Sequence, residues 1–300
     1  MSLLVVGTLA YDTVETPSGR VEDVLGGAAT YFAVAASFFG PVRLVGVVGK
    51  DFRAEDRALL QGRGILLDGL QVAPGKSFRW SGRYTGDLNV AQTLDTRLNV
   101  LEGYSPRVPQ AFRNSPFVFL ANSPPALQGA VLDQVGPGVL RAMDTMNLWI
   151  ESAYDDLLAM LRRVDMVILN DAEARAVTKE PFLIRAGRRM LELGPRIVMV
   201  KKGEHGAFLF SHNHFYAIPA YPLEHVVDPT GAGDSFAGGV MGYLAQAGEV
   251  DEEHLRRAMI YGSVMASFNV EDFSLNRFRR LTRAEIDARF DEFLRFTAHP

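Results

Sequence analysis

The sequence predicts an α/β protein whose doubly wound, mainly parallel sheet is flanked by helices. Short β-branched runs alternate with longer helical patterns, and the runs are apolar throughout, as in strands buried on both faces. The predicted strands are residues 3–7, 42–48, 117–120, 139–143, 166–169 and 197–200. The predicted helices are residues 27–39, 53–62, 152–162, 171–178, 182–193, 235–247, 252–268 and, as a charged terminal helix, 282–296.

Two stretches break this alternation, at about residues 9–24 and 71–100. They lack a helical period and read as antiparallel strands. Both leave the predicted sheet from neighbouring strands, so we expect them to pair into a small β-sheet lid that excludes water from a site. The alternative is ordinary decoration of the surface. No repeat or linker divides the chain, so we expect a single domain over residues 1–300.

Composition excludes several classes of protein. The 300 residues are 48% hydrophobic and 22% charged, which predicts a large core. A net charge of −4 without a basic run argues against binding to nucleic acid or to an anionic membrane. Cysteine is absent, which excludes disulfides, thiolate metal sites and a cysteine nucleophile. The uncharged residues 24–42 read as a buried helix, and the start lacks a signal-like pattern, so we expect a cytoplasmic protein.

The most informative segment contains Gly231, Ala232, Gly233 and Asp234. Its glycines permit backbone conformations that expose consecutive N–H groups, and the helix that begins near Asp234 adds its positive dipole end. This arrangement predicts an anion cradle with a carboxylate at its edge that can accept a proton from a hydroxyl. The local alternative is a glycine-rich turn in which Asp234 only caps a helix.

The full segment DPTGAGDSFAGG (228–239) resembles the C-terminal signature of the ribokinase-like, or PfkB, carbohydrate kinase family. The segments GGAAT (26–30) and VGVVGKD (45–51) resemble the N-terminal signature of the same family, in the expected order. The resemblance spans nearly the whole chain. It implies a ribokinase-like fold with a β lid and an ATP-dependent kinase that phosphorylates a hydroxyl group.

The resemblance also implies roles for individual residues. Asp234 would be the catalytic base, and Gly231, Ala232 and Gly233 would form the anion hole. Asn170 and Glu173 are similar to an Asn-x-x-Glu element that organises Mg²⁺ and phosphate, with Glu173 acting mostly through water. The local alternative for this pair is a helix cap.

Further positions resemble the nucleotide site of the family. Lys202, Gly203 and Gly206 match the turn beside the nucleotide phosphates, although Lys201 is adjacent and only one lysine of the pair can point inward. Asn269 falls where relatives build the adenine pocket. Asp228 lies where some relatives bind a monovalent cation through backbone oxygens, which leaves K⁺ activation open.

For the acceptor, the resemblance points to Asp12, which would bind substrate hydroxyls, and to Gly26 and Gly27, which would let the backbone approach the substrate. Tyr31 departs from the ribokinase pattern, where asparagine would be common. An aromatic residue there indicates either a less polar acceptor or simply helix packing. Polar lid and loop residues are further candidates for binding an anionic or polyol group: Arg79, Arg83, Arg97 and Asn122.

Together these observations predict an ATP- and Mg²⁺-dependent carbohydrate kinase with a sugar-like substrate. A nucleoside or inositol kinase of the same family is the first alternative, and a metabolite-binding regulator without catalysis is the second. The sequence leaves a homodimer through the lid open as well. The six histidines show no helical metal pair, and residues 212–214 read as a hairpin turn.

Overall fold

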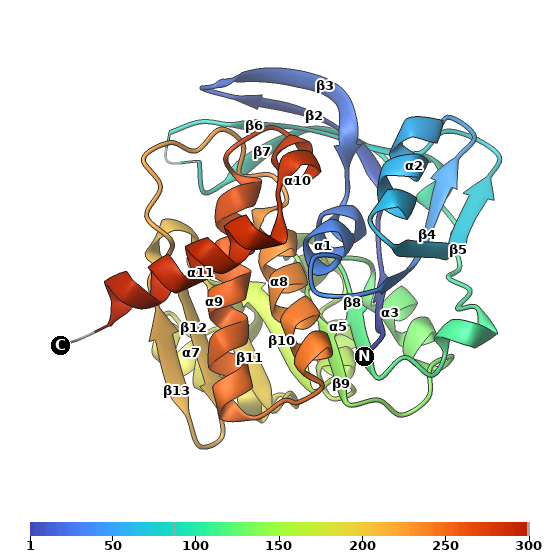
Figure 1. Cartoon of the computed structure of the whole chain (residues 1–300). Coiled ribbons are helices and arrows are strands. Elements are labelled where there is room, and N and C mark those ends of the chain that lie inside the picture. Colours follow the sequence, from blue (N-terminus) through green and yellow to red (C-terminus); the bar gives the residue numbers. More distant parts are fainter. Residues whose placement is uncertain (87, 299–300) are drawn as a thin grey trace.

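The computed structural model describes residues 1–86 and 88–298 and confirms the predicted fold class. A nine-stranded sheet forms the centre of the molecule, in the order β13-β12-β11-β10-β9-β8-β1-β4-β5 (Figure 1). Its strands are β1 (Leu3–Val6), β4 (Val42–Gly49), β5 (Ile65–Ala73), β8 (Phe117–Leu120), β9 (Leu140–Met143), β10 (Met166–Asn170), β11 (Ile197–Lys201), β12 (Ala207–Ser211) and β13 (Phe215–Ile218).

The strand order reverses around β1, which pairs in parallel with β4 on one side and β8 on the other. Strands β8 to β11 continue in parallel away from β1, and only β12 and β13 are antiparallel. In open α/β sheets ligands bind beyond the carboxyl ends of the strands at such a reversal. The topology therefore places a candidate site at the carboxyl ends of β1, β8 and their neighbours.

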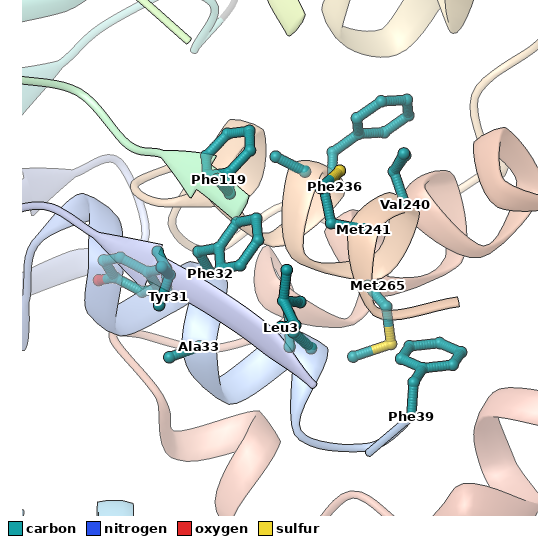
Figure 2. Packing of buried hydrophobic residues seen from close by; sticks show 14 of the residues in the cluster. Leu3, Tyr31, Phe32, Ala33, Phe39, Phe119, Phe236, Val240, Met241 and Met265 are labelled. Atoms are coloured by element: carbon teal, nitrogen blue, oxygen red, sulfur yellow. The ribbon is translucent and has the colours of Figure 1, made fainter. Parts of the chain in front are cut away.

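The helices cover both faces of the sheet and produce two separate hydrophobic cores. Leu3 and Val5 of β1 belong to the core under α1, α8 and α9, whereas Leu4 and Val6 belong to the core under α5, α6 and α7. Figure 2 shows the first core, with Phe32 stacked on Phe119 at 4.3 Å between ring centroids. The helices are α1 (Ala28–Ala36), α2 (Ala54–Gly62), α3 (Pro125–Leu132), α4 (Asn147–Ser152), α5 (Tyr154–Leu161), α6 (Asp171–Thr178), α7 (Leu183–Glu192), α8 (Ala232–Ala247), α9 (Glu252–Asn269), α10 (Asn276–Arg280) and α11 (Arg283–Thr297). In the part of the chain that the structure describes, none of the helices has the length and apolar character needed to cross a bilayer.

A second, four-stranded sheet lies along the top of the molecule in Figure 1, in the order β3-β2-β6-β7. Its strands are β2 (Ala10–Thr16), β3 (Gly19–Gly26), β6 (Phe78–Tyr84) and β7 (Ala91–Arg97). The two hairpins are antiparallel as predicted, but the prediction is wrong for the central pair, because β2 and β6 are parallel. The reason is topological: β2 follows β1 and β6 follows β5, so both strands leave the same edge of the large sheet in the same direction.

Other differences from the prediction concern helices and strands that the sequence pattern did not indicate. Residues 71–73 belong to β5 of the large sheet and not to the small one. The strands β12 and β13 and the helices α3 and α4 were not predicted; α3 starts with Pro125 at its first position, where proline is tolerated but reads as a helix breaker. The turn at residues 212–214 is confirmed, since the Ser211 N–H donates to the carbonyl oxygen of His214 across it.

Candidate active site

The glycine-rich loop before α8 packs against the ring of Tyr31. Gly231 is the N-cap of α8 with φ of +77°, a conformation that favours glycine. A Cβ built on Gly231 would lie 2.3 Å from Cγ of Tyr31, so the aromatic ring fills the space that any side chain would need. The first turn of a helix leaves N–H groups without intrahelical acceptors, so this loop can bind an anion.

Asp234 lies in that first turn. Burial raises the pKa of its carboxyl to about 6, against the opposing effects of the Lys201 ammonium and of a backbone N–H. A carboxylate with a pKa near neutrality is suited to accept a proton from a hydroxyl and to release it again. Asp234 therefore lies beside the N–H groups at the start of α8 with a pKa that is compatible with accepting a proton.

Lys201, at the end of β11, is the lysine that points to this loop. A Cβ built on Gly233 would lie 2.6 Å from its Nζ. Its charge lowers the pKa values of Asp234, Glu173 and Asp144, which places the ammonium among three carboxyl groups. Lys202 turns the other way and puts its Nζ 3.7 Å from the centre of the Phe208 ring. The structure thus brings Lys201, and not the candidate Lys202, to the glycine loop.

Asn170 and Glu173 form a capping box at the start of α6. The Asn170 Oδ1 accepts from the Glu173 N–H at 2.8 Å, and the Asn170 N–H donates to Glu173 Oε2 at 2.7 Å. Glu173 is buried, and burial raises its pKa against the influence of Lys201. Glu173 can therefore be part of the helix cap and also bind a ligand. One of its carboxylate oxygens accepts from the Asn170 N–H, and the other can face a ligand.

Asp144 follows β9 and was not predicted. It is 5% exposed, and its Oδ1 has no hydrogen-bond partner among the described residues. Burial raises its pKa well above the ordinary value, with Asp234 contributing. An orphaned carboxylate oxygen beside Glu173 is suited to a hydrated cation. A sequence signal existed, because an aspartate directly after an apolar parallel strand lies at the edge where ligands bind.

Asp12 of β2 is a further buried acidic residue that interacts electrostatically with Asp228 and Asp234. It is 4% exposed, and its pKa is raised to about 8 by burial and then by Asp228, against a hydrogen bond from the Gly27 N–H. A Cβ on Gly26 would lie 1.9 Å from Asp12 Oδ2, and a Cβ on Gly27 would lie 2.6 Å from the Thr8 carbonyl oxygen. Gly26 is therefore required for Asp12 to occupy its position, and Gly27 is required for the close approach of the backbone at residues 8–10.

Tyr31 and Asp228 are both buried behind this region. Tyr31 is 1% exposed and its hydroxyl has no hydrogen-bond partner among the described residues. The ring packs in the first core, as Figure 2 shows. The Asp228 carboxylate accepts from the Thr230 N–H at 2.9 Å and from the Ser274 N–H at 3.4 Å. Tyr31 and Asp228 therefore both contact the glycine-rich loop from the protein interior, through Gly231 and Thr230 respectively.

Asn269 also holds the loop. Its Nδ2 donates to the Thr230 carbonyl oxygen at 2.7 Å, and its Oδ1 accepts from the Ser235 hydroxyl at 2.9 Å. It is 1% exposed. Since both ends of its amide are bound to protein groups on either side of the glycine loop, Asn269 is placed to position that loop and not to face a nucleotide.

The turn between β11 and β12 lies close to the tip of the small sheet. Gly203 and Gly206 both have positive φ, at +56° and +85°. A Cβ on Gly203 would lie 2.4 Å from Oδ1 of Asn89, which belongs to the loop between β6 and β7. The small sheet therefore spans from Asp12 to the turn that the sequence assigned to nucleotide phosphates.

The candidate arginines of the small sheet pair with acidic groups instead of converging on the glycine loop. Arg83 donates to Glu15 at 3.0 Å, and Arg79 donates to Asp51 at 3.0 Å. Arg97 donates to Asp95 at 2.7 Å. Asn122 is bound by Trp149, whose Nε1 donates to its Oδ1 at 2.8 Å.

Comparison with known proteins gives consistent results. The family model described as pfkB family carbohydrate kinase matches residues 2–278. A cytidine kinase of Thermococcus kodakarensis is 30% identical over 260 residues, covering 84% of this chain and 91% of that protein. An inositol 3-kinase of Arabidopsis thaliana is 25% identical, covering 92% of this chain and 76% of that protein. The solved nucleoside kinase of Methanocaldococcus jannaschii superposes with a TM-score of 0.78 at 21% identity, over 97% of this chain and 98% of that one, which shows the shared fold.

Proposed function

The chain belongs to the pfkB family of carbohydrate kinases and is a kinase that uses ATP to phosphorylate a small substrate; from this premise we propose that the substrate is a nucleoside and that Asp234 is the base that activates its hydroxyl. The observation that carries the proposal is the position of Asp234 next to Gly233 and Lys201, within electrostatic reach of the buried Asp12. One carboxyl can bind the acceptor while the other takes its proton.

The reaction follows from this arrangement. Asp12 holds the hydroxyl-bearing part of the acceptor, and Asp234 removes the proton from the reacting hydroxyl. The hydroxyl oxygen forms a bond to the γ-phosphorus of ATP while the bond from that phosphorus to the β,γ-bridging oxygen breaks, so ADP leaves. The N–H groups of Gly231 and Gly233 and the Lys201 ammonium stabilise the negative charge of the transferring group, whereas the Ala232 N–H donates to the Pro229 carbonyl oxygen at 3.1 Å. Little covalent chemistry is required of the protein, since positioning and charge stabilisation dominate phosphoryl transfer.

Glu173 and Asp144 are the residues we propose for Mg²⁺. Both carboxyl groups are buried, and the orphaned Oδ1 of Asp144 fits a hydrated cation that prefers oxygen ligands. Mg²⁺ supplies neutralisation of phosphate charge when it is bound. K⁺ at the backbone oxygen of Asp228, a homodimer through the small sheet and a cytoplasmic location stay predictions.

A nucleoside acceptor is favoured over a free sugar by the relative with the highest identity reported above, which is a cytidine kinase. The inositol 3-kinase relative keeps a cyclitol as the alternative acceptor. The alternative of a regulator without catalysis is disfavoured, because Asp234 is in place with a pKa suited to proton transfer.

The test measures ADP released from Mg-ATP by the purified protein against a panel of nucleosides, pentoses, hexoses and inositols. We expect turnover with at least one nucleoside, and a loss of at least about 100-fold in the Asp234→Asn variant with nucleotide binding kept. Turnover only with a free sugar or cyclitol would reject the nucleoside. Near-normal turnover in Asp234→Asn would reject the assigned base.

A further inference from the structure

Trp80 lies on the face of the small sheet that is turned toward the glycine loop. Three side chains identify this face: Asp12 interacts electrostatically with Asp234, the Thr16 hydroxyl donates to the Val227 carbonyl oxygen, and Tyr84 accepts from the Thr230 hydroxyl. Because side chains alternate along a strand, Trp80 lies on the same side of β6 as Tyr84.

The pairing of the strands gives the same result. β2 and β6 are parallel, and Trp80 is the direct partner of Asp12 in their register. Partners in adjacent strands point to the same face and lie about 5 Å apart. The indole is therefore the immediate neighbour of the carboxyl group that we propose for binding the acceptor hydroxyls.

The indole lies flat against the sheet, and Gly82 makes this possible. A Cβ built on Gly82 would lie 2.1 Å from Cη2 and 2.3 Å from Cζ2 of Trp80, so the six-membered ring occupies the position of the missing side chain. The Trp80 Nε1 donates to the Thr93 hydroxyl of β7 at 3.3 Å, which fixes the rotation of the ring. Trp80 is half-buried, so it presents an aromatic face that the protein does not cover completely.

We propose that this face is a stacking surface for the base of the acceptor nucleoside, with Gly82 and Thr93 holding the indole flat. The inference rests on the proposed function, because it assigns the base to the same site in which Asp12 binds the sugar. A nucleoside carries a hydroxyl-bearing ring and a planar ring side by side, which matches a carboxyl group and an aromatic face on neighbouring strands. Stacking tolerates different bases because every base has a π-face, so we expect Trp80 to favour nucleosides as a class.

The experiment uses the fact that the chain has two tryptophans, Trp80 and Trp149. In a Trp149→Phe background, the emission of Trp80 is titrated with cytidine, inosine and ribose in the absence of ATP. We expect saturable quenching by the nucleosides and none by ribose. This readout needs no turnover, so it reports on the base surface even where the proposed reaction fails.

Kinetic variants give the second arm. Trp80→Leu is expected to raise the KM for nucleosides about tenfold, from the loss of one base–aromatic stack, with the KM for ATP unchanged. Trp80→Phe keeps an aromatic ring and should recover most of the loss. Gly82→Ala should act like Trp80→Leu, since the added Cβ displaces the indole. Ser81→Ala, on the opposite face of the same strand, is the matched control and should leave both constants unchanged.

The outcomes separate the two proposals. Quenching by nucleosides without their phosphorylation keeps the stacking surface and rejects the reaction. Phosphorylation of nucleosides with normal KM in Trp80→Leu and Gly82→Ala keeps the reaction and rejects the stacking surface. Equal quenching by ribose and by nucleosides also rejects it, because the indole would then bind the sugar.

Discussion

The ring of Tyr31 lies directly against Gly231, and the two residues together define the floor and the bend of the glycine-rich loop before α8. Tyr31 comes from α1 and Gly231 from the start of α8, so the contact joins the N-terminal and C-terminal signatures of the chain. This contact explains the aromatic residue at position 31 by packing, because the buried ring supports the loop.

The Gly231→Ala variant should lose activity. A methyl group at this position meets the Tyr31 ring, and φ of +77° strains any residue with a Cβ, so the loop must move. Because its N–H groups would no longer aim at the transferring group, we expect turnover to fall at least about 100-fold.

Gly248→Ala is the control, since Gly248 has a similar φ of +81° at the other end of α8 and its Cβ would meet only the flexible end of Met1. Gly248→Ala should lose roughly 1 kcal/mol of stability in thermal unfolding from backbone strain, and Gly231→Ala should lose more because of the Tyr31 ring, but only Gly231→Ala should lose turnover. Equal turnover of the two variants would show that the loop does not bind the transferring group.

The Asn269→Ala variant should lower turnover through the loop. It removes hydrogen bonds to the Thr230 carbonyl oxygen and the Ser235 hydroxyl, and buried groups left unpaired cost about 1–3 kcal/mol. We expect a lower melting temperature and a lower kcat, with the KM for ATP nearly unchanged. If only the KM for ATP increased, the result would support the role predicted from the sequence, in which Asn269 contacts the nucleotide.

Much of the fold could be predicted, and the residues at the centre of the candidate site could be named, because both depend on local patterns. Apolar runs identify buried strands, and the GAGD segment carries its own chemistry in four consecutive residues. Which of Lys201 and Lys202 points to the glycine-rich loop could not be predicted. Side chains alternate along a strand, so one lysine must point to the loop, but the sequence does not say which one. Asn269 was predicted in an adenine pocket, whereas its amide is hydrogen-bonded to Thr230 and Ser235, whose spacing in three dimensions no local pattern contains. The direction of β6 relative to β2 depends on how the whole chain leaves the large sheet.

The Asp12→Asn variant should be more stable than the parent protein at neutral and higher pH. Burial raises the folded-state pKa of Asp12 to about 8, above the ordinary value of 3.8 for an aspartate. Between these values the folded state holds a proton that the unfolded state has released, so the carboxyl group makes stability fall as pH rises.

Asparagine removes this pH dependence while its Oδ1 can still accept from the Gly27 N–H. Thermal unfolding at pH 5 and pH 8 should show an advantage for the variant that grows with pH, reaching at least about 1 kcal/mol, together with a higher KM for the acceptor. A constant difference at both pH values would contradict the raised pKa.

Lys201→Met should shift the acidic limb of the pH profile to higher pH. Asp234 must be deprotonated to act as a base, so kcat/KM should fall as pH drops through its pKa of about 6. The Lys201 charge lowers the pKa values of Asp234, Asp144 and Glu173, and its removal therefore raises all three. Because these groups interact, the limb reports an apparent pKa of the cluster, and this value should increase.

Lys202→Met provides the matched control, since it removes the same charge from the next residue, whose ammonium lies on the Phe208 ring away from the glycine loop. The acidic limb of the pH profile of Lys202→Met should lie at the same pH as that of the parent protein. The measurement is kcat/KM across the acidic range for the three proteins. If both lysine variants shifted the limb equally, the effect would come from net charge at the end of β11 and not from an ammonium held among the three carboxyl groups.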